Sequence, residues 1–530
     1  MNLIWDTTKH YSNYPDEIKK EYKKNYIKYL NQFTYWIDDI SKSNKSNLDW
    51  WLSTAASRDE RVSDLYHNLC IYFTLKNNNK ELNLSLIIIN SKAFKKILIR
   101  DFEKNFSIRV KKSYFFRDIL FVKNLIFYFF QFVFIKLFFL KKKINYNLSL
   151  IGTYVVNSKD YNFYGNFNKI KNKDKFLVPV FTNVSLKNFI FYIFKLAKNK
   201  KILFKETYLR FSDLVYLFFY KININFKNEK IFFFNKINFL ELILEEIKSN
   251  KYTRPVLQGY LNFFFFKVIK KNNLNLIFSI NSFENQIPDK GWNLGINSFY
   301  PKALNIGHQS VSYHPQFQNL YPTNSEYSSK VLPSNIYVNG SFFAKERNKY
   351  CKKVNFYLTK DFKFKKVKKI KKDIEILILL SGIKSHDIQL LNLIVKNYNY
   401  FKKKKIYVYF KFHPILESKY IFKNISSYNY FKEITGIGSI IIERSKLIIT
   451  SSFTAGLYES LIRNCYTLLY GMHPLDYKLY KKFNNINNFL FFENLRSMID
   501  LLNIFINKKI IFSKKNNIKL KNLKAIFFNN

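Results

Sequence analysis

Three stretches in the C-terminal third of the chain decide the fold: IEILILLSG at 374–382, IYVYFKFHP at 406–414 and LIITSSFTAGLYES at 447–460. Each opens with an apolar run and closes on small or polar residues, which is typical of a buried parallel strand and the turn after it. Helical apolar spacing follows at 386–398 and 454–463. Strands that alternate with helices predict a parallel α/β sheet covered by helices on both faces.

The carboxyl ends of these strands carry the first candidate site. In open α/β sheets ligands bind beyond those ends, where Gly382, His413, Ser451 and Ser452 lie. A helix that begins near Thr454 offers unpaired backbone N–H groups and a positive dipole end to an anion. An imidazole donates to a phosphate oxygen or, when protonated, neutralises it. We predict a nucleotide phosphate site; the alternative is ordinary helix capping by Ser and Thr with a structural histidine.

Further polar residues extend this candidate set. Glu459 lies within the helix after the serine pair, where it is expected to accept from a ribose hydroxyl or, alternatively, to face solvent. In the N-terminal half, Glu284 follows a strand expected at 274–281 and is the best candidate for a general base. The alternative for Glu284 is a helix cap or a surface acid. His308 and Gln309 end the next expected strand and are predicted to contact nucleotide or acceptor.

The order of patterns along the chain predicts the domains. Residues 1–83 have helical spacing, and 84–340 alternate strands with helices as an N-terminal Rossmann-like domain. A lysine-rich connector at 363–372 precedes a C-terminal Rossmann-like domain at 373–510, and 511–530 form a basic tail. The boundary between the two domains is expected within 341–372.

Charge and cysteine usage limit the partners. The formal net charge is +51, spread as dispersed lysines without a zinc finger or an arginine-rich tract, so no nucleic-acid partner is expected. An anionic lipid surface or a phosphorylated substrate fits better. Three scattered cysteines have no metal-ligand spacing, there is no Asp-x-Asp motif, and residues 1–17 do not resemble a secretory signal. We therefore expect a cytoplasmic protein without a metal.

One segment, 114–143, is strongly apolar and aromatic. Lysines interrupt it, and its uninterrupted apolar part at 125–135 is shorter than the roughly 20 residues that a spanning helix needs. Two interpretations remain open. The segment is either an amphipathic helix on an anionic membrane surface or a buried helix of the N-terminal domain.

Short motifs resemble known families. KFHP at 411–414 and ITSSFTAGLYES at 449–460 resemble the His-Pro and Ser-Ser motifs of bacterial sialyltransferases, polysialyltransferases and capsule Kdo transferases. These are GT-B enzymes that use CMP-activated nonulosonic acids. The resemblance implies that His413, Ser451 and Ser452 hold the CMP phosphate. Teichoic-acid glycerophosphotransferases, which use CDP-glycerol, share similar motifs.

A second resemblance covers more of the chain. Its motifs are WxLS at 50–53, FENQ at 283–286, NIGHQS at 305–310 and PSNIYVNG at 333–340. Together with the C-terminal motifs they look like a bacterial family of surface carbohydrate biosynthesis proteins. The acidic base motif of sialyltransferases, two acids followed by glycine, is absent from the sequence. Glu284 therefore stands in for the base.

These resemblances imply a metal-independent, inverting glycosyltransferase of surface polysaccharide, capsule or lipopolysaccharide biosynthesis. Its α/β fold would be GT-B-like, with a helical N-terminal region and two Rossmann-like domains facing one cleft. The expected partners are a nucleotide sugar, which serves as substrate with no further cofactor, a glycan or lipid-linked acceptor, and an anionic membrane surface. The protein would then be peripheral on the inner face of the membrane. The alternatives are a glycerophosphotransferase or nucleotide-sugar epimerase on the same fold, and a non-catalytic membrane-associated assembly protein.

Overall fold

The computed structural model divides the chain into two units. Unit 1 comprises Met1–Gln309, Phe317–Tyr337 and Glu346–Tyr357, and the described residues of unit 2 fall within Val338–Lys345 and Leu358–Asn530. The structure describes residues 3–78, 82–102, 106–111, 114–142, 144, 147–154, 175–181, 186–220, 222–224, 229–309, 317–359, 370–413, 425, 427–483, 486 and 488–507. The expected basic tail at 511–530, most of the connector at 363–372, Lys143 and Ser310 lie outside these residues.

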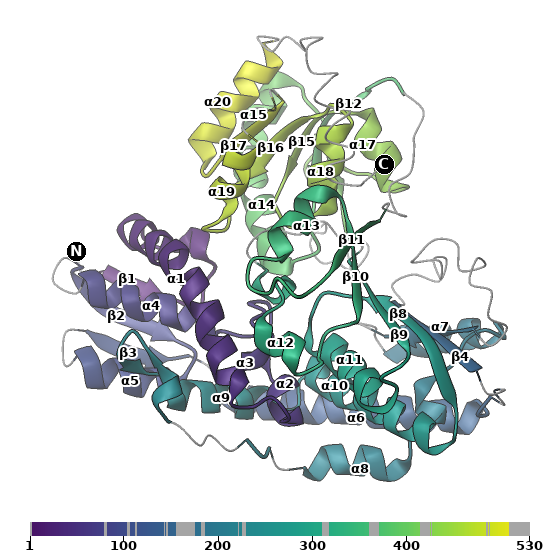
Figure 1. The fold of residues 1–530 in the computed structure, drawn as a ribbon. Coiled ribbons are helices and arrows are strands. Elements are labelled where there is room, and N and C mark those ends of the chain that lie inside the picture. The colour runs from purple at the N-terminus through teal and green to yellow at the C-terminus, as the bar shows by residue number, and fades with distance from the viewer. Residues whose placement is uncertain are drawn as a thin grey trace. The chain divides into compact units, whose positions relative to one another are not determined.

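Unit 2 is built on one parallel sheet (Figure 1). Its strands are β12 (Ile374–Leu379), β13 (Val408–Lys411), β14 (Phe431–Glu433), β15 (Ser445–Thr450), β16 (Tyr466–Tyr470) and β17 (Phe489–Phe492). They lie in the order β14-β13-β12-β15-β16-β17, and every neighbouring pair is parallel. Numbered along the chain, this is the 3-2-1-4-5-6 order of the Rossmann fold, whose order reverses between the first and fourth strands, here β12 and β15.

Helices cover both faces of that sheet, as the continuous apolar strands predict. The helices are α14 (Lys384–Lys396), α15 (Tyr398–Lys404), α17 (Gly438–Arg444), α18 (Ala455–Ile462), α19 (Asp476–Lys482) and α20 (Leu495–Ile506). Ile376 and Ile378 of β12 pack into a core with α14, α15 and α20, whereas Leu377 and Leu379 pack on the other face with Ile441 of α17. The α/β fold expected here from the sequence is confirmed.

Unit 1 holds most of a second six-stranded sheet, in the order β11-β10-β9-β8-β4-β5, and the last residues of β10 and β11 are assigned to unit 2. The strands are β4 (Asn147–Tyr154), β5 (Lys175–Val180), β8 (Asn275–Ser282), β9 (Leu304–Gln309), β10 (Asn335–Asn339) and β11 (Phe356–Thr359). The pairs β4-β5, β4-β8 and β8-β9 are parallel, and the order reverses between β4 and β8. This order is Rossmann-like too. The expectation that the two units face one cleft stays a prediction.

Helices on the two faces of this sheet form separate cores. One core contains residues of β4 and β8 with α8 (Phe211–Phe219), α10 (Arg254–Lys271) and α11 (Ile287–Phe299). The other contains Ile151 of β4 and Leu177 of β5 with α7 (Leu186–Ala197). Helix α6 (Tyr114–Phe138) contributes Phe132 to the first core and Ile135 to the second.

The N-terminal region differs from the all-helical expectation for 1–83. Its helices α1 (Asp16–Lys42), α2 (Leu48–Trp51), α3 (Thr54–Ser57) and α4 (Leu65–Asn78) follow a strand, β1 (Leu3–Asp6). β1 pairs in parallel with β2 (Leu84–Ile89), which pairs with β3 (Ser107–Val110) after α5 (Lys92–Phe102). Four residues are too few to show a strand period, so this strand depends on a partner far along the chain.

Candidate functional site

Four loops of unit 2 meet at the carboxyl edge of its sheet. Gly382, after β12, has φ +87°, and a Cβ there would lie 2.8 Å from the ring of His413, which follows β13. The ring of His386, at the start of α14, stacks edge-on against Phe453 after β15, with centroids 4.1 Å apart. Phe453 in turn lies 6.2 Å from the ring of His473, after β16. The loops thus converge on both sides of the point where the strand order reverses.

The serine pair expected to bind phosphate divides into two environments. The hydroxyl of Ser451 is buried and finds no hydrogen-bond partner among the described residues. The hydroxyl of Ser452 donates to the buried carboxylate of Asp476, with 2.6 Å between the oxygens. Buried hydroxyls almost always have a partner, so an unpartnered one calls for an explanation such as a bound group or water. Ser451 is therefore the serine available to a ligand.

Helix α18 begins beside these serines. Thr454 is its N-cap and accepts from the backbone N–H of Gly456 at 3.2 Å. A Cβ at Gly456 would lie 2.1 Å from the Leu379 side chain, so glycine allows the first turn to press onto the end of β12. The positive end of the α18 dipole therefore lies at the reversal point of the sheet.

Two buried aspartates hold the neighbouring loops. Asp387 accepts from the backbone N–H and hydroxyl of Ser381, at 2.7 and 2.8 Å, and from the N–H of Gly382 at 2.9 Å. Burial raises the pKa of the Asp387 carboxyl, while these hydrogen bonds act to lower it. Asp476 accepts from the backbone N–H groups of Met472 and His473, both at 2.8 Å. Each aspartate lies in the first turn of the helix that follows its loop.

Sequence reasoning missed Asp387, Asp476 and His386. The signal that could have found the aspartates is an acid a few residues after a strand end, in the first turn of the next helix. Glu459, expected to contact the ribose, forms an ion pair with Arg463 at 2.8 Å, and Arg463 also pairs with Glu443 at 3.1 Å. A contact of Glu459 with a nucleotide stays a prediction.

In unit 1 the sequence-predicted base, Glu284, lies in the loop between β8 and α11. Its carboxylate accepts from the side-chain amide of Gln286 at 2.7 Å and lies 3.4 Å from the Arg61 guanidinium. The side chain is partly exposed. Below it, Asp289 accepts from the backbone N–H groups of Glu284 and Gln286 at 2.9 and 3.1 Å. Burial raises the pKa of Asp289 to about 7.

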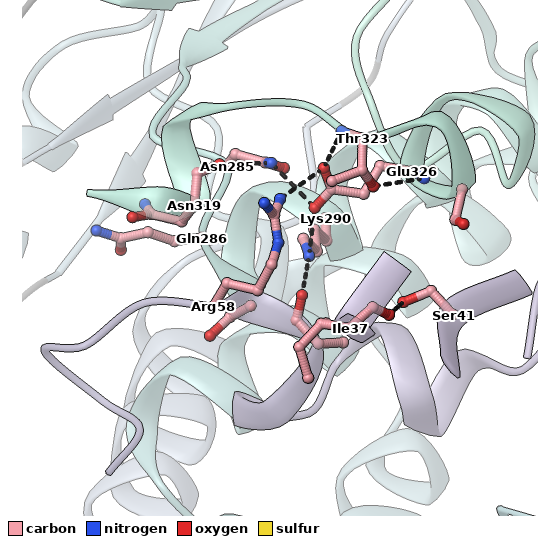
Figure 2. A network of polar contacts seen from close by, with 12 residues as sticks. Ile37, Ser41, Arg58, Asn285, Gln286, Lys290, Asn319, Thr323 and Glu326 are labelled. Carbon is pink, nitrogen blue, oxygen red and sulfur yellow. Dashed lines mark hydrogen bonds and ion pairs between the residues drawn. The ribbon is translucent and has the colours of Figure 1, made fainter. Parts of the chain in front are cut away.

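A buried ion network fixes this loop (Figure 2). Glu326 is fully buried and pairs with Arg58 at 2.9 Å and with Lys290 at 2.8 Å. The Asn285 amide donates to Glu326 at 3.1 Å and to the carbonyl of Asn319 at 2.7 Å. The two cations lower the pKa of Glu326 against the opposing effect of burial. Because a buried charge without a partner is costly, this network holds the β8-α11 loop in one position.

His308 and Gln309 end β9 and are buried. Neither amide atom of Gln309 has a hydrogen-bond partner among the described residues, and the same holds for Oδ1 of Asn281 and Oγ1 of Thr153. Thr153 and Asn281 lie near the carboxyl ends of β4 and β8, where the order of this sheet reverses. Uncharged groups of this kind suit hydroxyl ligands better than phosphate.

The chain resembles known proteins in fold and not in sequence. The sequence matches no known protein family and no curated protein. Among solved structures, it is similar to MurG of Acinetobacter baumannii, at 8% identity and a TM-score of 0.35 over 73% of this chain and 95% of MurG. It is also similar to a UDP-glucosyltransferase from Polygonum tinctorium capable of glucosylating indoxyl, at 9% identity and a TM-score of 0.29 over 72% and 94% of the two chains. The Rossmann-like assignment rests on the strand order in each unit.

Proposed function

We propose that this chain is a glycosyltransferase that binds a nucleotide sugar at the carboxyl edge of the unit 2 sheet. The observation that carries the proposal is the buried, unpartnered hydroxyl of Ser451 beside the N-terminus of α18, at the point where the sheet order reverses. Rossmann-type sheets bind nucleotides at that point. The motifs around His413 and Ser451 also resemble those of enzymes that use CMP-activated sugars.

The chemistry assigned to unit 2 is stabilisation of the leaving phosphate. In the transfer, the bond between the anomeric carbon and the donor phosphate oxygen breaks, and negative charge builds on the departing nucleotide. Ser451 donates a hydrogen bond to a phosphate oxygen, and the helix dipole of α18 adds a positive potential. His413 donates a second hydrogen bond or a proton to the departing phosphate. Fixed donors aimed at a developing charge are the largest electrostatic contribution to such a reaction.

The acceptor side is assigned to unit 1. Glu284 takes the proton of the acceptor hydroxyl, whose oxygen then forms the new bond to the anomeric carbon with inversion. Asp289 and the Glu326 network support the loop that carries Glu284. Gln309, Asn281 and Thr153 offer uncharged hydrogen-bonding groups to a glycan. We infer that the donor is a CMP-activated nonulosonic acid. The acceptor would be a glycan or a lipid-linked intermediate of surface polysaccharide or lipopolysaccharide synthesis. The reaction would take place at the inner face of the membrane.

Thermal unfolding in the presence of CMP, CDP, UDP and GDP tests the donor site. A ligand that binds only the folded protein raises its stability by about 2.7 kcal/mol when present at roughly 100 times its Kd. We expect CMP to raise the Tm most. A preference for UDP or GDP would replace the nonulosonate donor, and no shift with any nucleotide would contradict the proposal.

The variant His413→Ala tests the leaving-group role. It should keep the wild-type Tm in the absence of nucleotide and lose most transfer activity with a nucleotide-sugar donor, because the departing phosphate loses a donor. Full transfer activity in this variant would exclude His413 from the reaction.

A further inference from the structure

Exposed apolar side chains concentrate on three helices of unit 1. Among the described residues, 14 of the 29 large hydrophobic side chains that are exposed fall within residues 119–219. They lie on α6, α7 and α8, or just after α6 at Leu140. A large contiguous apolar surface usually marks a binding site for another body.

Helix α6 is apolar on two opposite faces. The buried face carries Leu125, Tyr128, Phe132 and Ile135. The exposed face carries Ile119, Val122, Ile126, Phe129 and Leu137. On the buried face these positions recur at three- or four-residue spacing. The same spacing joins Ile119 to Phe129 on the exposed face, and the half-buried Val133 lies four residues from both Phe129 and Leu137. Packing in the unit 1 cores explains the first stripe, whereas the side chains of the second stripe stay exposed.

Helices α7 and α8 extend the exposed stripe on either side of α6. On one side the ring of Phe211, which begins α8, lies 6.1 Å from the ring of Phe129. On the other side the ring of Phe194, on α7, lies 6.2 Å from the ring of Phe138. All four rings are exposed. The three helices therefore form one surface, which we call the three-helix face.

The outer parts of the same helices continue it. On α8, Phe211, Val215 and Phe219 form a stripe at four-residue spacing, and Phe219 is 80% exposed. On α7, Phe191 is 60% exposed and recurs with Phe194 on one side of the helix. Figure 1 shows α6 and α8 side by side along one margin of unit 1.

The exposed charges that these helices carry among their described side chains are basic. The exposed lysines on these helices, or within a few residues after α6 and α7 in the chain, are Lys123, Lys136, Lys141, Lys195, Lys198, Lys200 and Lys201. The Lys136 ammonium lies 5.2 Å from the centroid of the Phe132 ring, which belongs to the buried stripe, so this cation lies at the edge of that buried stripe. The acids with described side chains in residues 119–220 are Glu206 and Asp213, and both are buried.

We propose that the three-helix face is the surface by which this protein lies on an anionic phospholipid bilayer. Exposed Phe and Leu side chains enter the boundary between head groups and acyl chains, and the surrounding lysines attract the lipid phosphates. The exposed lysines of these helices and the width of the apolar surface together fit this partner. Among the described residues, no helix is long and apolar enough to cross a membrane.

Vesicle co-sedimentation of the full chain tests the proposal. Wild-type protein should pellet with vesicles of phosphatidylcholine mixed with phosphatidylglycerol, and much less with phosphatidylcholine alone. The triple variant Leu137→Gln, Phe191→Gln and Phe219→Gln should lose most binding to the mixed vesicles. The triple variant Lys136→Gln, Lys195→Gln and Lys198→Gln should lose the preference for the anionic lipid.

A matched control removes exposed apolar side chains from helices elsewhere: Ile99→Gln, Tyr327→Gln and Ile504→Gln. It should bind mixed vesicles as the wild type does. Because all the replaced side chains are exposed, the Tm of every variant should match the wild type. Equal binding by the wild type and the Leu137, Phe191 and Phe219 variant would overturn the proposal. A second result would also overturn it: the wild type forms an oligomer and does not bind vesicles, and the Leu137, Phe191 and Phe219 variant is a monomer. The three-helix face would then be an interface between two copies of the chain.

A depth measurement checks insertion directly. In the variant Phe219→Trp, lipids with brominated acyl chains should quench the new tryptophan, whereas the five native tryptophans should be quenched much less. Absence of quenching in a vesicle-bound protein would show that Phe219 does not insert. The nucleotide site is assigned to unit 2, so the membrane-face variants should keep the Tm shift that a nucleotide causes in the wild type. Vesicle binding and nucleotide binding therefore test the two proposals separately.

Discussion

The hydroxyl of Ser452 donates to the carboxylate of Asp476, which lies 2.6 Å away in the first turn of the next helix but one. The same carboxylate accepts from two backbone N–H groups of the loop after β16. Asp476 thereby ties the loop that carries the serine pair to the neighbouring loop. Because the Ser452 hydroxyl already donates to Asp476, Ser451 is the serine whose hydroxyl is available to a ligand.

Removal of that carboxylate should destabilise unit 2. Asp476→Ala leaves three donors without this acceptor, two of them in buried hydrogen bonds, and each such buried loss costs about 1–3 kcal/mol. Ser452→Ala removes only one hydrogen bond and should cost about 1 kcal/mol. Urea unfolding measures both free energies. Similar small losses for the two variants would contradict the tying role of Asp476.

Ser451→Ala should separate stability from function. The wild-type hydroxyl is buried without a partner, so its loss should leave the free energy of unfolding unchanged or raise it by up to about 1 kcal/mol. Nucleotide affinity should nevertheless fall, because a phosphate donor is lost. Urea unfolding measures the change in stability, and a nucleotide thermal shift on the same preparation measures the change in nucleotide affinity. A marked loss of stability would mean that the hydroxyl has a structural partner.

Gly382→Ala should disturb His413. The φ of +87° disfavours a side chain, and the new Cβ would meet the imidazole at 2.8 Å. We expect a stability loss of about 1–3 kcal/mol and a large loss of transfer activity. Gly436→Ala is the matched control, because Gly436 has φ +123° but its nearest described neighbour to a Cβ is 3.8 Å away. The Gly436→Ala control should lose stability and keep transfer activity. If both variants lost activity equally, backbone strain alone would explain the loss, and the contact with His413 would have no role.

Asp289 should make stability depend on pH. Burial raises its pKa from 3.8 to about 7, so between these values the folded protein binds the proton more tightly than the unfolded chain does. The contribution of this group to the free energy of unfolding therefore falls as pH rises through that window, by at most on the order of 4 kcal/mol.

The variant Asp289→Asn isolates this contribution. Its stability relative to the wild type should improve on going from pH 5 to pH 8, as measured by urea unfolding at each pH. An asparagine oxygen can still accept from the backbone N–H of Glu284, so the loop should persist. The same stability difference at both pH values would show that Asp289 titrates in its ordinary range.

Much of the unit 2 fold was predictable from local patterns. The strands expected in the stretches that begin at 374, 406 and 447 correspond to β12, β13 and β15, because buried parallel strands are continuous apolar runs. β14 was missed because it has three residues, two of them exposed and charged. In unit 1, β5 was missed because it contains a proline, which weakens a strand pattern. Neighbours in the sequence do not pair here: Glu443 pairs with Arg463, and Arg444 pairs with Asp373.

The segment at 114–143 shows why the two interpretations of its sequence were inseparable. Both a buried helix and a membrane-surface helix require an apolar stripe, and α6 has one stripe of each kind. Periodicity reports that a face is apolar, whereas only the neighbouring helices decide whether that face is covered. The exposed stripes of α7 and α8 belong to the same surface only because ring contacts join them to α6.

By itself, the sequence determined the α/β class and the placing of Gly382, His413, Ser451 and Ser452 at strand ends, because strand periodicity and turn residues are local properties. Only the tertiary structure decided which serine is occupied and which is available. That distinction depends on Asp476, which lies 24 residues beyond Ser452 and reaches it through the order in which strands pair in the sheet. The order of the strands in the sheet is set by packing over the whole unit, so it cannot be predicted from a local sequence pattern.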